Sequence, residues 1–438
     1  MPQNWFKPRG YRHFDVQVGE KFAARVQDPT FVSKHPFSPL LHYIKKEKRY
    51  KKCSETGERT IEEKNRLIKY ASHRDACIYS WYANQLTQAL DKYYSIYGID
   101  DSVIAYRALG QSNYHFAAEA LAFAQANSPV MILAFDVTSF FDNLDHALLK
   151  RRFKAVLEVN DLSDDWLKVF RNITRFHFVD MFELKSHPAF GPRFKARSKD
   201  PIATLAELKA KGIRFHPNPE VAAGRRRGIP QGTPISAAAS NLYMVDFDAA
   251  ARKYCDSIGA FYRRYSDDIL VICKLIDADQ AEEEIVRLIA NELLEIQPAK
   301  TERTRFDENA TLPKASKAAQ YLGFTLHETG PAIREPSLAR QWRRMRRAMR
   351  RTRRVAELRI STGKAHKAYT KKLRRRFTNI KFNDGTATRS IRNFSSYARR
   401  SAEAFGDGRK IIRQVKRLER VALKEIVGIK ELGNGEKK

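Results

Sequence analysis

The sequence predicts a mixed α/β protein with a small antiparallel sheet at its centre and a basic helical module at its C-terminal end. Two β-forming runs, residues 262–265 and 269–273, flank the turn formers Ser266, Asp267 and Asp268 and so predict a β-hairpin. The apolar run 130–133 predicts a buried strand. With a helix after the hairpin, these segments favour a βαββ-type core.

Helical periodicity supports that reading of the segment after the hairpin. Asp277 stands at an expected N-cap, and apolar residues then recur along one helix face: Ala281, Ile285, Leu288, Ile289 and Leu293. Further helices are predicted over residues 75–94, 204–211 and 237–254. Residues 64–74 alternate basic and apolar side chains as a half-exposed strand pair would, and prolines break 160–224 into an irregular insertion.

Three acidic residues are predicted to meet at the strand ends. An Asp-Asp pair in a turn is usually only solvated, but here two β-forming strands flank it, and Asp136 ends the predicted strand 130–136 where it could face Asp267 and Asp268. Neighbouring carboxylates repel each other unless a cation lies between them. Three could hold two divalent ions roughly 3.5–4 Å apart. Asp142, by contrast, is expected to cap a helix beginning near Leu144.

Charge points to a polyanionic partner. The 438 residues, enough for two or three domains, include 81 Lys and Arg against 50 Asp and Glu, a net charge of +31. Nucleic acid is the expected partner and a membrane is not, because no 18-residue apolar run or signal peptide occurs. Without a CxxC pair, the four cysteines are expected to be reduced thiols in the cytoplasm, which are Cys53, Cys77, Cys255 and Cys273.

The basic C-terminal region is expected to bind nucleic acid. Residues 340–420 contain 28 Lys or Arg and five Asp or Glu, whereas a merely solvated face would mix the signs. The candidate phosphate contacts are Arg343, Arg347, Arg374 and Arg375. Two other stretches stay open: residues 228–236 could approach a ligand or only lead into a helix, and the aromatic, basic segment 1–60 could contact nucleic acid, although packing is favoured.

Five motifs together resemble those of reverse transcriptases in order and approximate spacing. They are Phe135-Asp136-Val137-x-x-Phe140-Phe141-Asp142, Gly228-Ile229-Pro230-Gln231-Gly232-x-Pro234-x-Ser236, Tyr265-Ser266-Asp267-Asp268, Lys300-Thr301 and Tyr321-Leu322-Gly323-Phe324. Each is weak alone, but the ordered set is specific. The resemblance covers about residues 60–330 by motif and implies a right-hand polymerase fold with an N-terminal extension at 1–60, fingers and palm at 61–330, and a basic helical thumb at 331–438.

The resemblance also implies roles for individual residues. Asp136, Asp267 and Asp268 would be catalytic ligands of two Mg²⁺ ions, with Mn²⁺ as an alternative metal and the Val137 carbonyl as an extra ligand. Residues matching the nucleotide site are Phe141 as the gate against a ribose 2′-OH, Gln231 beside the incoming nucleotide, Lys300 near the leaving pyrophosphate and Arg66 on the triphosphate.

Within the family, the chain is most similar to bacterial enzymes of the "unknown group" and abortive-infection type. Its His-Pro-Phe-Ser-Pro-Leu segment, residues 35–40, resembles defence-associated reverse transcriptases, especially class 2. This implies cDNA synthesis from dNTPs on an RNA template in antiphage defence, with a dedicated non-coding RNA as the candidate template. A template-independent or protein-primed DNA polymerase remains an alternative, and a catalytically dead RNA-binding protein would need a broken aspartate triad. The sequence leaves the oligomeric state open.

Overall fold

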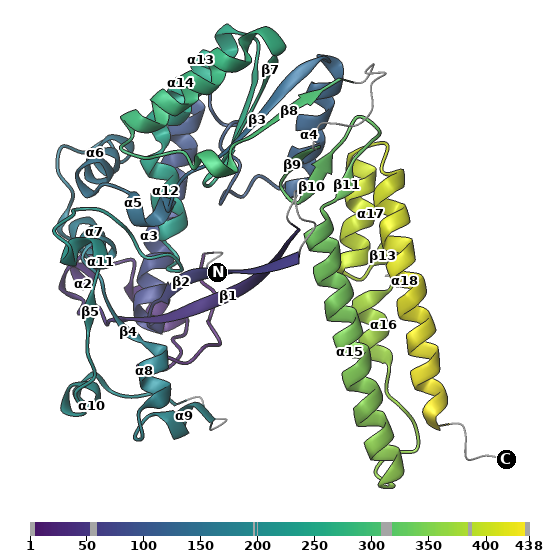
Figure 1. Ribbon diagram of the computed structural model, residues 1–438. Coiled ribbons are helices and arrows are strands. Elements are labelled where there is room, and N and C mark those ends of the chain that lie inside the picture. The colour runs from purple at the N-terminus through teal and green to yellow at the C-terminus, as the bar shows by residue number, and fades with distance from the viewer. Residues whose placement is uncertain are drawn as a thin grey trace.

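The computed structural model describes residues 5–52, 59–195, 198, 200–307, 318–383 and 388–433. Figure 1 shows a bundle of long helices standing beside the sheet-containing remainder of the chain, and a long hairpin extending from that remainder toward the bundle. Cys53 lies outside the described residues. In the described ranges, no helix combines the length and apolar character needed to cross a membrane.

The central sheet has four antiparallel strands in the order β6-β7-β3-β8. Their bounds are β3 Val130–Asp136, β6 Phe261–Tyr265, β7 Asp268–Lys274 and β8 Glu302–Phe306. The hairpin forms because the β-forming residues on either side of 266–267 pair in register, with Tyr265 opposite Asp268. The predicted βαββ arrangement is confirmed, since helix α14, Ala278–Asn291, connects β7 toward β8.

Both faces of the central strands β3 and β7 are largely buried, which explains why these two strands are almost continuously apolar. Leu133, Phe135 and Val271 pack with α14 on one side. Ile132 and Ile272 pack on the other side in a second core that includes helix α4, Asn113–Ala126. Because the sheet is enclosed by two cores, its strand ends are held in a fixed position.

The predicted helix after the hairpin is present, but two of its details are wrong. Asp277 occupies the N-cap position without a side-chain capping hydrogen bond, because its backbone is already helical with a short 3₁₀ turn, Leu275–Asp277, before it. Leu293 lies beyond the end of α14, has a φ of 58° and is 62% exposed. The periodic pattern therefore ends at Ile289, which is fully buried.

The long hairpin is formed by β1, Leu40–Lys52, and β2, Arg59–Tyr70, in antiparallel register. Residues 64–70 are thus one strand paired with β1, so the expectation of a strand pair within 64–74 is wrong. Alternation alone shows that a strand is half exposed and cannot identify its partner. The boundary predicted at residue 60, between the N-terminal extension and the domain that follows it, falls inside this hairpin. The predicted helix that follows is α3, His73–Ile96.

The irregular region 160–224 forms short elements around a separate small core. Its strand β4, His177–Asp180, runs parallel to β1, and its predicted helix is confirmed as α10, Leu205–Ala210, with a Thr204 capping box. The other short elements nearby are α7 Asp164–Thr174, α8 Met181–Ser186, α9 Gly191–Lys195, β5 His216–Pro217 and α11 Pro219–Ala222. The small core joins this insertion to the N-terminal segment through Phe14 and Leu41.

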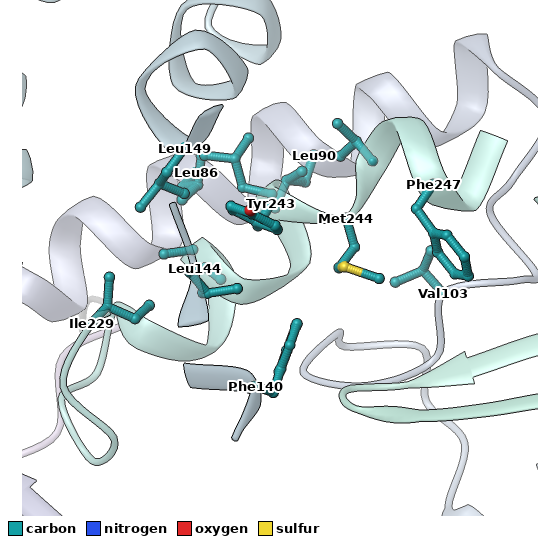
Figure 2. Close-up of a cluster of buried hydrophobic side chains, with 14 of the residues drawn as sticks. Leu86, Leu90, Val103, Phe140, Leu144, Leu149, Ile229, Tyr243, Met244 and Phe247 are labelled. Atoms are coloured by element: carbon teal, nitrogen blue, oxygen red, sulfur yellow. The ribbon is translucent and has the colours of Figure 1, made fainter. Parts of the chain in front are cut away.

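A cluster of buried hydrophobic side chains holds several helices together next to the central sheet (Figure 2). The helices that meet there are α3, α5 Phe140–Asn143, α6 His146–Val156, α12 Ser236–Tyr243 and α13 Val245–Ser257. Tyr243 is fully buried, and its hydroxyl donates to the Glu292 carbonyl at 2.7 Å while accepting from the Asp145 amide at 3.3 Å. This one side chain therefore ties the start of α6 to the segment after α14.

The C-terminal module consists mainly of helices and joins the sheet through three short strands. These strands are β9 Ala319–Tyr321, β10 Phe324–Leu326 and β11 Ala332–Ile333. The predicted start of the C-terminal module, residue 331, falls between β10 and β11. The module's elements are α15 Glu335–Ser361, α16 Lys371–Phe377, β12 Lys381–Asn383, β13 Thr388–Ser390, α17 Phe394–Ala404 and α18 Arg409–Lys430. Met345, Met349 and Leu418 belong to its own core, so the many arginines are left outside.

Candidate active site

The two strand ends predicted to carry carboxylates lie side by side. Asp136, the last residue of β3, is directly opposite Asp268, the first residue of β7. Residues directly opposite in an antiparallel pair have Cα atoms about 4.5–5.5 Å apart. Ser266 and Asp267 form the two-residue turn between β6 and β7, and Ser266 takes a left-handed φ of 61°, as such tight turns require. The structure thus brings Asp136, Asp267 and Asp268 together.

Proximity of these carboxylates makes ionisation unfavourable. Burial raises the pKa of Asp268 to about 6, with the like charges of Asp267 and Asp136 adding to the rise, and burial followed by Asp136 also raises the pKa of Asp267. Lys64 acts in the opposite direction on both. Asp268 as a whole residue is exposed, so we give more weight to the repulsion among the carboxylates, which follows directly from the strand register.

Lys300 forms an ion pair with the Asp136 carboxylate. It ends a 3₁₀ turn, Pro298–Lys300, and the preceding Gln297 amide donates to the Asp136 carbonyl at 2.8 Å. With Asp136 in this pair, no group of three His, Cys, Asp or Glu side chains within the described ranges is gathered as a metal site. A site shared by all three aspartates would require the Asp136 side chain to turn from Lys300. Val137 is buried, and its amide donates to the Asp267 carbonyl at 3.4 Å.

Phe141 and Gln231 are brought together by a loop that packs against β2. The Ile229 amide donates to the Phe141 carbonyl at 2.9 Å, and the Lys69 amide donates to the Gln231 carbonyl at 2.8 Å. Gly232 has a φ of +122°, and a Cβ there would lie 2.8 Å from the Lys69 carbonyl oxygen. Only glycine fits this close approach. The close backbone approach therefore explains the glycine at position 232, and the side chains of Phe141 and Gln231 are each half-buried.

Arg66 lies on the long hairpin, where its Nη1 pairs with the Glu47 carboxylate at 2.7 Å. It is two positions from Lys64 and so shares a strand face with the lysine that acts on Asp267 and Asp268. Against the effect of burial, Lys45, Arg66 and Arg340 of α15 lower the pKa of Glu47. The hairpin therefore lies within electrostatic range of both the carboxylates and the C-terminal module.

The four arginines predicted to contact RNA are all exposed, but they do not form one surface. Arg343 and Arg347 are one helical turn apart on α15. Arg375 lines a groove with Arg344 of α15, whereas Arg374 lines a different groove with Arg399 of α17. Adjacent positions on a helix point about 100° apart, which explains why Arg374 and Arg375 separate.

Asp142 does not cap the following helix, so that expectation is wrong. Asp142 lies within α5, and the N-cap of α6 is Asp145, whose carboxylate accepts from the Leu148 amide at 2.8 Å. The Asp142 backbone instead abuts Gly228: a Cβ on that glycine would lie 2.9 Å from the Asp142 carbonyl oxygen. Burial raises the pKa of Asp142, with Lys69 as the nearby opposing charge.

A buried ion pair supports the turn formed by Ser266 and Asp267. The sequence did not predict this pair. Arg264 and Asp248 are both fully buried and form a bidentate pair, with distances of 2.6 and 2.7 Å. The same guanidinium donates to the Ser266 carbonyl at 3.0 Å and to Asn241 at 3.2 Å. An arginine inside an otherwise buried strand was the available clue, but only tertiary structure identifies the carboxylate, 16 residues away, that pairs with it.

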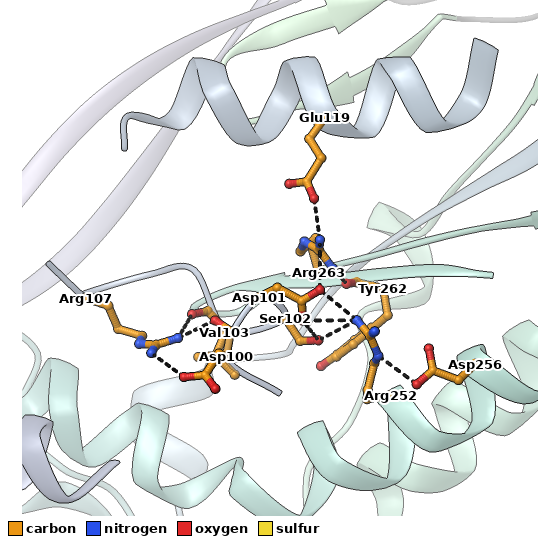
Figure 3. Close-up of polar contacts among 10 residues, drawn as sticks. All are labelled: Asp100, Asp101, Ser102, Val103, Arg107, Glu119, Arg252, Asp256, Tyr262 and Arg263. Atoms are coloured by element: carbon orange, nitrogen blue, oxygen red, sulfur yellow. Dashed lines mark hydrogen bonds and ion pairs between the residues drawn. The ribbon is translucent and has the colours of Figure 1, made fainter. Parts of the chain in front are cut away.

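The neighbouring segment 102–106 extends the sheet beyond β6. Arg264 exchanges backbone hydrogen bonds with Ser102 at 2.8 Å and Ile104 at 3.1 Å. Figure 3 shows how exposed carboxylates then gather around the same edge, with Arg263 pairing with Glu119 and with Asp101. These pairs anchor the segment that leads to Tyr106.

Tyr106 is a second functional candidate that the sequence analysis missed. Its φ of 61° is unusual for an aromatic residue, and its hydroxyl donates to the Ser266 Oγ at 3.2 Å. Asn241, the partner of Arg264, also donates to the carbonyl of the preceding Ala105 at 2.8 Å. The turn containing Asp267 is consequently held by Arg264 on one side and by a strained tyrosine on the other. No periodic or motif pattern distinguishes this tyrosine in the sequence.

Comparison with protein families identifies one match. Residues 45–326, more than half of the chain, match the family described as "Reverse transcriptase (RNA-dependent DNA polymerase)". The match contains both strand ends and the loop with Gln231. No curated protein is similar enough to the chain to count as a match.

Solved structures to which the chain shows some similarity include telomerases and a viral polymerase. The apo telomerase of Candida tropicalis truncated from its C-terminal domain is 11% identical, with 73% of this chain and 61% of that chain covered and a TM-score of 0.43. Telomerase of Candida albicans in complex with a TWJ fragment of telomeric RNA is 12% identical, with 93% and 58% covered and a TM-score of 0.39. The Sicinivirus 3Dpol RNA-dependent RNA polymerase is 12% identical, with 73% and 57% covered and a TM-score of 0.38. The chain thus spans about six tenths of these proteins' lengths.

Replacing Asp267 and Asp268 together by Asn should stabilise the metal-free protein at neutral pH. A carboxyl pKa that is raised on folding costs stability as pH rises from the unfolded value toward the folded one, about 6 for Asp268, and the full cost is present above it. Near pH 7.5 we expect the melting temperature of the variant to be at least about 2 °C above that of the parent. Near pH 4 the two proteins should melt at the same temperature. Calorimetry at both values tests this; a gain that persists at low pH would contradict the charge explanation.

Tyr106→Phe should loosen the turn without unfolding the protein. Loss of one hydrogen bond of about 1 kcal/mol predicts about fivefold faster local opening of residues 265–268, measured as amide hydrogen exchange. Ser266→Ala should loosen the turn at least as much, because it removes this bond and also the hydroxyl's hydrogen bond to Asp267. Adding Tyr106→Phe to Ser266→Ala should then change nothing further. Tyr369→Phe, at a tyrosine that is 70% exposed, is the control. Additive effects of the two changes would show that the bond is not their common cause.

Proposed function

We propose, because the chain belongs to the reverse transcriptase (RNA-dependent DNA polymerase) family, that it synthesises cDNA from dNTPs on an RNA template. Its central sheet, long hairpin and basic helical module are then the palm, fingers and thumb of a right-hand polymerase. The observation that carries the proposal is the strand register that sets Asp136 opposite Asp268, beside the Asp267 turn. Nucleotidyl transfer requires charge neutralisation and alignment of the reacting oxygens. Carboxylates at this position could hold the cations that supply both.

Divalent cations fit this set of donors. Oxygen ligands suit Mg²⁺ and Mn²⁺. Burial, together with repulsion among the carboxylates, raises the pKa values of Asp267 and Asp268, and a bound cation would favour their ionised forms. We propose that Asp136, Asp267 and Asp268, with the Val137 carbonyl, hold two such ions. When bound, the ions would lower the pKa of a primer 3′-OH and neutralise the triphosphate. Lys300 neutralises Asp136 in the present arrangement and would be released toward the leaving pyrophosphate.

The surrounding residues would orient the nucleotide. Phe141 lies in α5, directly after the β3 strand end, and we assign it the exclusion of a ribose 2′-OH. Gln231, held on β2 by its carbonyl, is proposed to lie beside the incoming base and sugar. Arg66 would exchange its partner Glu47 for triphosphate oxygens, which offer stronger bidentate hydrogen bonding. Proximity and charge then supply most of the catalysis.

The thumb is proposed to bind the RNA template through four exposed arginines, which are Arg343, Arg347, Arg374 and Arg375. An excess of 31 positive charges favours a polyanion, and such binding should weaken steeply as salt increases. We further propose a role in antiphage defence with a dedicated structured RNA as template, supported by the resemblance of residues 35–40 to defence-associated enzymes. In this chain His35 binds the buried Asp75 at 2.8 Å, which gives the segment a packing role as well. Sequencing RNA that co-purifies with the protein tests the dedicated template.

Asp267→Ala with Asp268→Ala should abolish DNA synthesis while leaving the fold and RNA binding intact. The change removes two proposed ligands at a turn and also removes repulsion between buried charges. Incorporation of labelled dNTPs on a defined primer–template measures the first effect, and melting and RNA binding measure the others. Activity within about tenfold of the parent would refute the assignment of these aspartates. Asp161→Ala, at an exposed acidic residue elsewhere, is the matched control.

Phe141→Ala should let the enzyme use ribonucleotides. Removing the ring opens the space proposed to be closed to the 2′-OH, so the ratio of rNTP to dNTP use, each measured as kcat/KM, should rise at least about tenfold. Phe182→Ala, which truncates a phenylalanine that is 79% exposed, should leave the ratio unchanged. A Phe141 variant that rejects rNTPs as strongly as the parent would show that the gate lies elsewhere.

A further inference from the structure

A basic groove between α17, α18 and the segment 379–381 is not used by the proposed reaction. It has a volume of about 860 Å³. Its six cationic residues are Lys381, Arg399, Arg400, Arg409, Arg413 and Lys416, and Glu403 is its acidic residue. We call it the outer thumb groove. Such a concentration of one charge in a concave surface favours an anionic ligand.

The outer thumb groove faces away from the palm. Tyr397 of α17 packs on α4, with its hydroxyl donating to Asn113 Oδ1 at 3.1 Å, and Gln414 of α18 bonds to Ile333 of β11 at 2.9 and 3.1 Å. Arg399 and Lys416 each follow one of these anchors by two positions. Two positions correspond to about 200° around a helix, so the side chains of Arg399 and Lys416 point away from the anchored faces. A duplex held between palm and thumb would lie on the anchored side.

Several groups in the groove are available to a ligand. Within the parts of the chain that the structure describes, the side chains of Arg400, Arg413 and Lys416 form no ion pair. Asn379 Oδ1 and Arg399 Nε are buried without a hydrogen-bond partner. Buried polar atoms are normally paired, so either side chain would gain a hydrogen bond by turning toward a ligand in the groove. The N-terminus of the 22-residue helix α18 lies at the same groove and adds partial positive charge.

We propose that the outer thumb groove binds the sugar–phosphate backbone of an RNA segment separate from the primer–template duplex. The cations and the α18 N-terminus would contact phosphates. Asn379 Oδ1 is an acceptor, and along a nucleic-acid backbone the 2′-hydroxyl of ribose is the group that can donate to it. That feature favours RNA over DNA. The inference adds a second RNA contact to the proposed polymerase. It rests on the proposed function only where it says that the cleft between palm and thumb holds a primer–template duplex.

The test compares two variants of the full chain that lose equal charge. The groove variant is Arg400→Ala with Arg413→Ala and Lys416→Ala, and the control variant changes three exposed cations of the insertion, Lys209, Lys211 and Arg214, to Ala. The probe is a labelled oligouridine of about 20 nucleotides, longer than the roughly 4–16 nucleotides that single-strand-binding modules cover. A saturating unlabelled primer–template hairpin occupies the cleft during the anisotropy measurement. Matched melting temperatures confirm that each variant is folded.

We expect the groove variant to bind the probe at least about tenfold more weakly and to lose about 2 from its salt slope, since each single-strand phosphate contact contributes about 0.7. Its extension of the preformed hairpin should stay within about twofold of the parent. The control variant should bind the probe nearly as the parent does. If the triple groove variant does not fold, Lys416→Glu alone, at an exposed position, should weaken probe binding in the same direction.

Three results would overturn the inference. They are unchanged probe binding in a folded groove variant, a loss equal to that of the control variant, and a parallel loss of hairpin extension that would place the groove on the primer–template path. Equal weakening toward an oligothymidine of the same length would overturn the assignment to RNA. A parent protein that extends no primer would contradict the proposed polymerase instead, and the probe-binding comparison would still be decisive for the groove.

Discussion

The antiparallel register of β3 and β7 is the constraint on which the candidate site depends. It places the carboxylates of Asp136 and Asp268 opposite each other, and a shift of one residue would turn one of them to the other face. The register is enforced by burial, because both faces of these strands belong to hydrophobic cores. Stability from apolar packing therefore maintains a cluster of charges that repel one another.

The turn that completes the cluster is held by polar contacts of a different kind. Arg264 satisfies a buried charge pair with Asp248 and also binds the Ser266 carbonyl, so the ion pair contributes geometry to the turn. Removing one partner of such a pair leaves an uncompensated buried charge, which is costly. The strained Tyr106 approaches from the other side. Strain of this kind persists only where surrounding structure fixes the backbone, as the hydrogen bonds of residues 102–105 do here.

Positive charge is distributed so that the thumb has more than one binding surface. A small apolar core around Met345 and Leu418 leaves the arginines of α15 to α18 on the outside of the module. Of these arginines, Arg340 of α15 lies within electrostatic range of Glu47 on the long hairpin. Those around the outer thumb groove face away from the palm. Under the two proposals above, the module holds two segments of nucleic acid at once, which a single basic stripe cannot.

The sequence by itself determined the strand and helix segments, the aspartates at the strand ends and the basic character of the C-terminal module, because periodicity, turn chemistry and composition are local properties. Tertiary structure alone decided which partners these segments have. It paired residues 64–70 with β1, gave the helix cap to Asp145 instead of Asp142, and set Lys300 on Asp136. The Arg264–Asp248 pair and the left-handed Tyr106 depend on contacts between segments that are separated in the sequence, which no local pattern encodes.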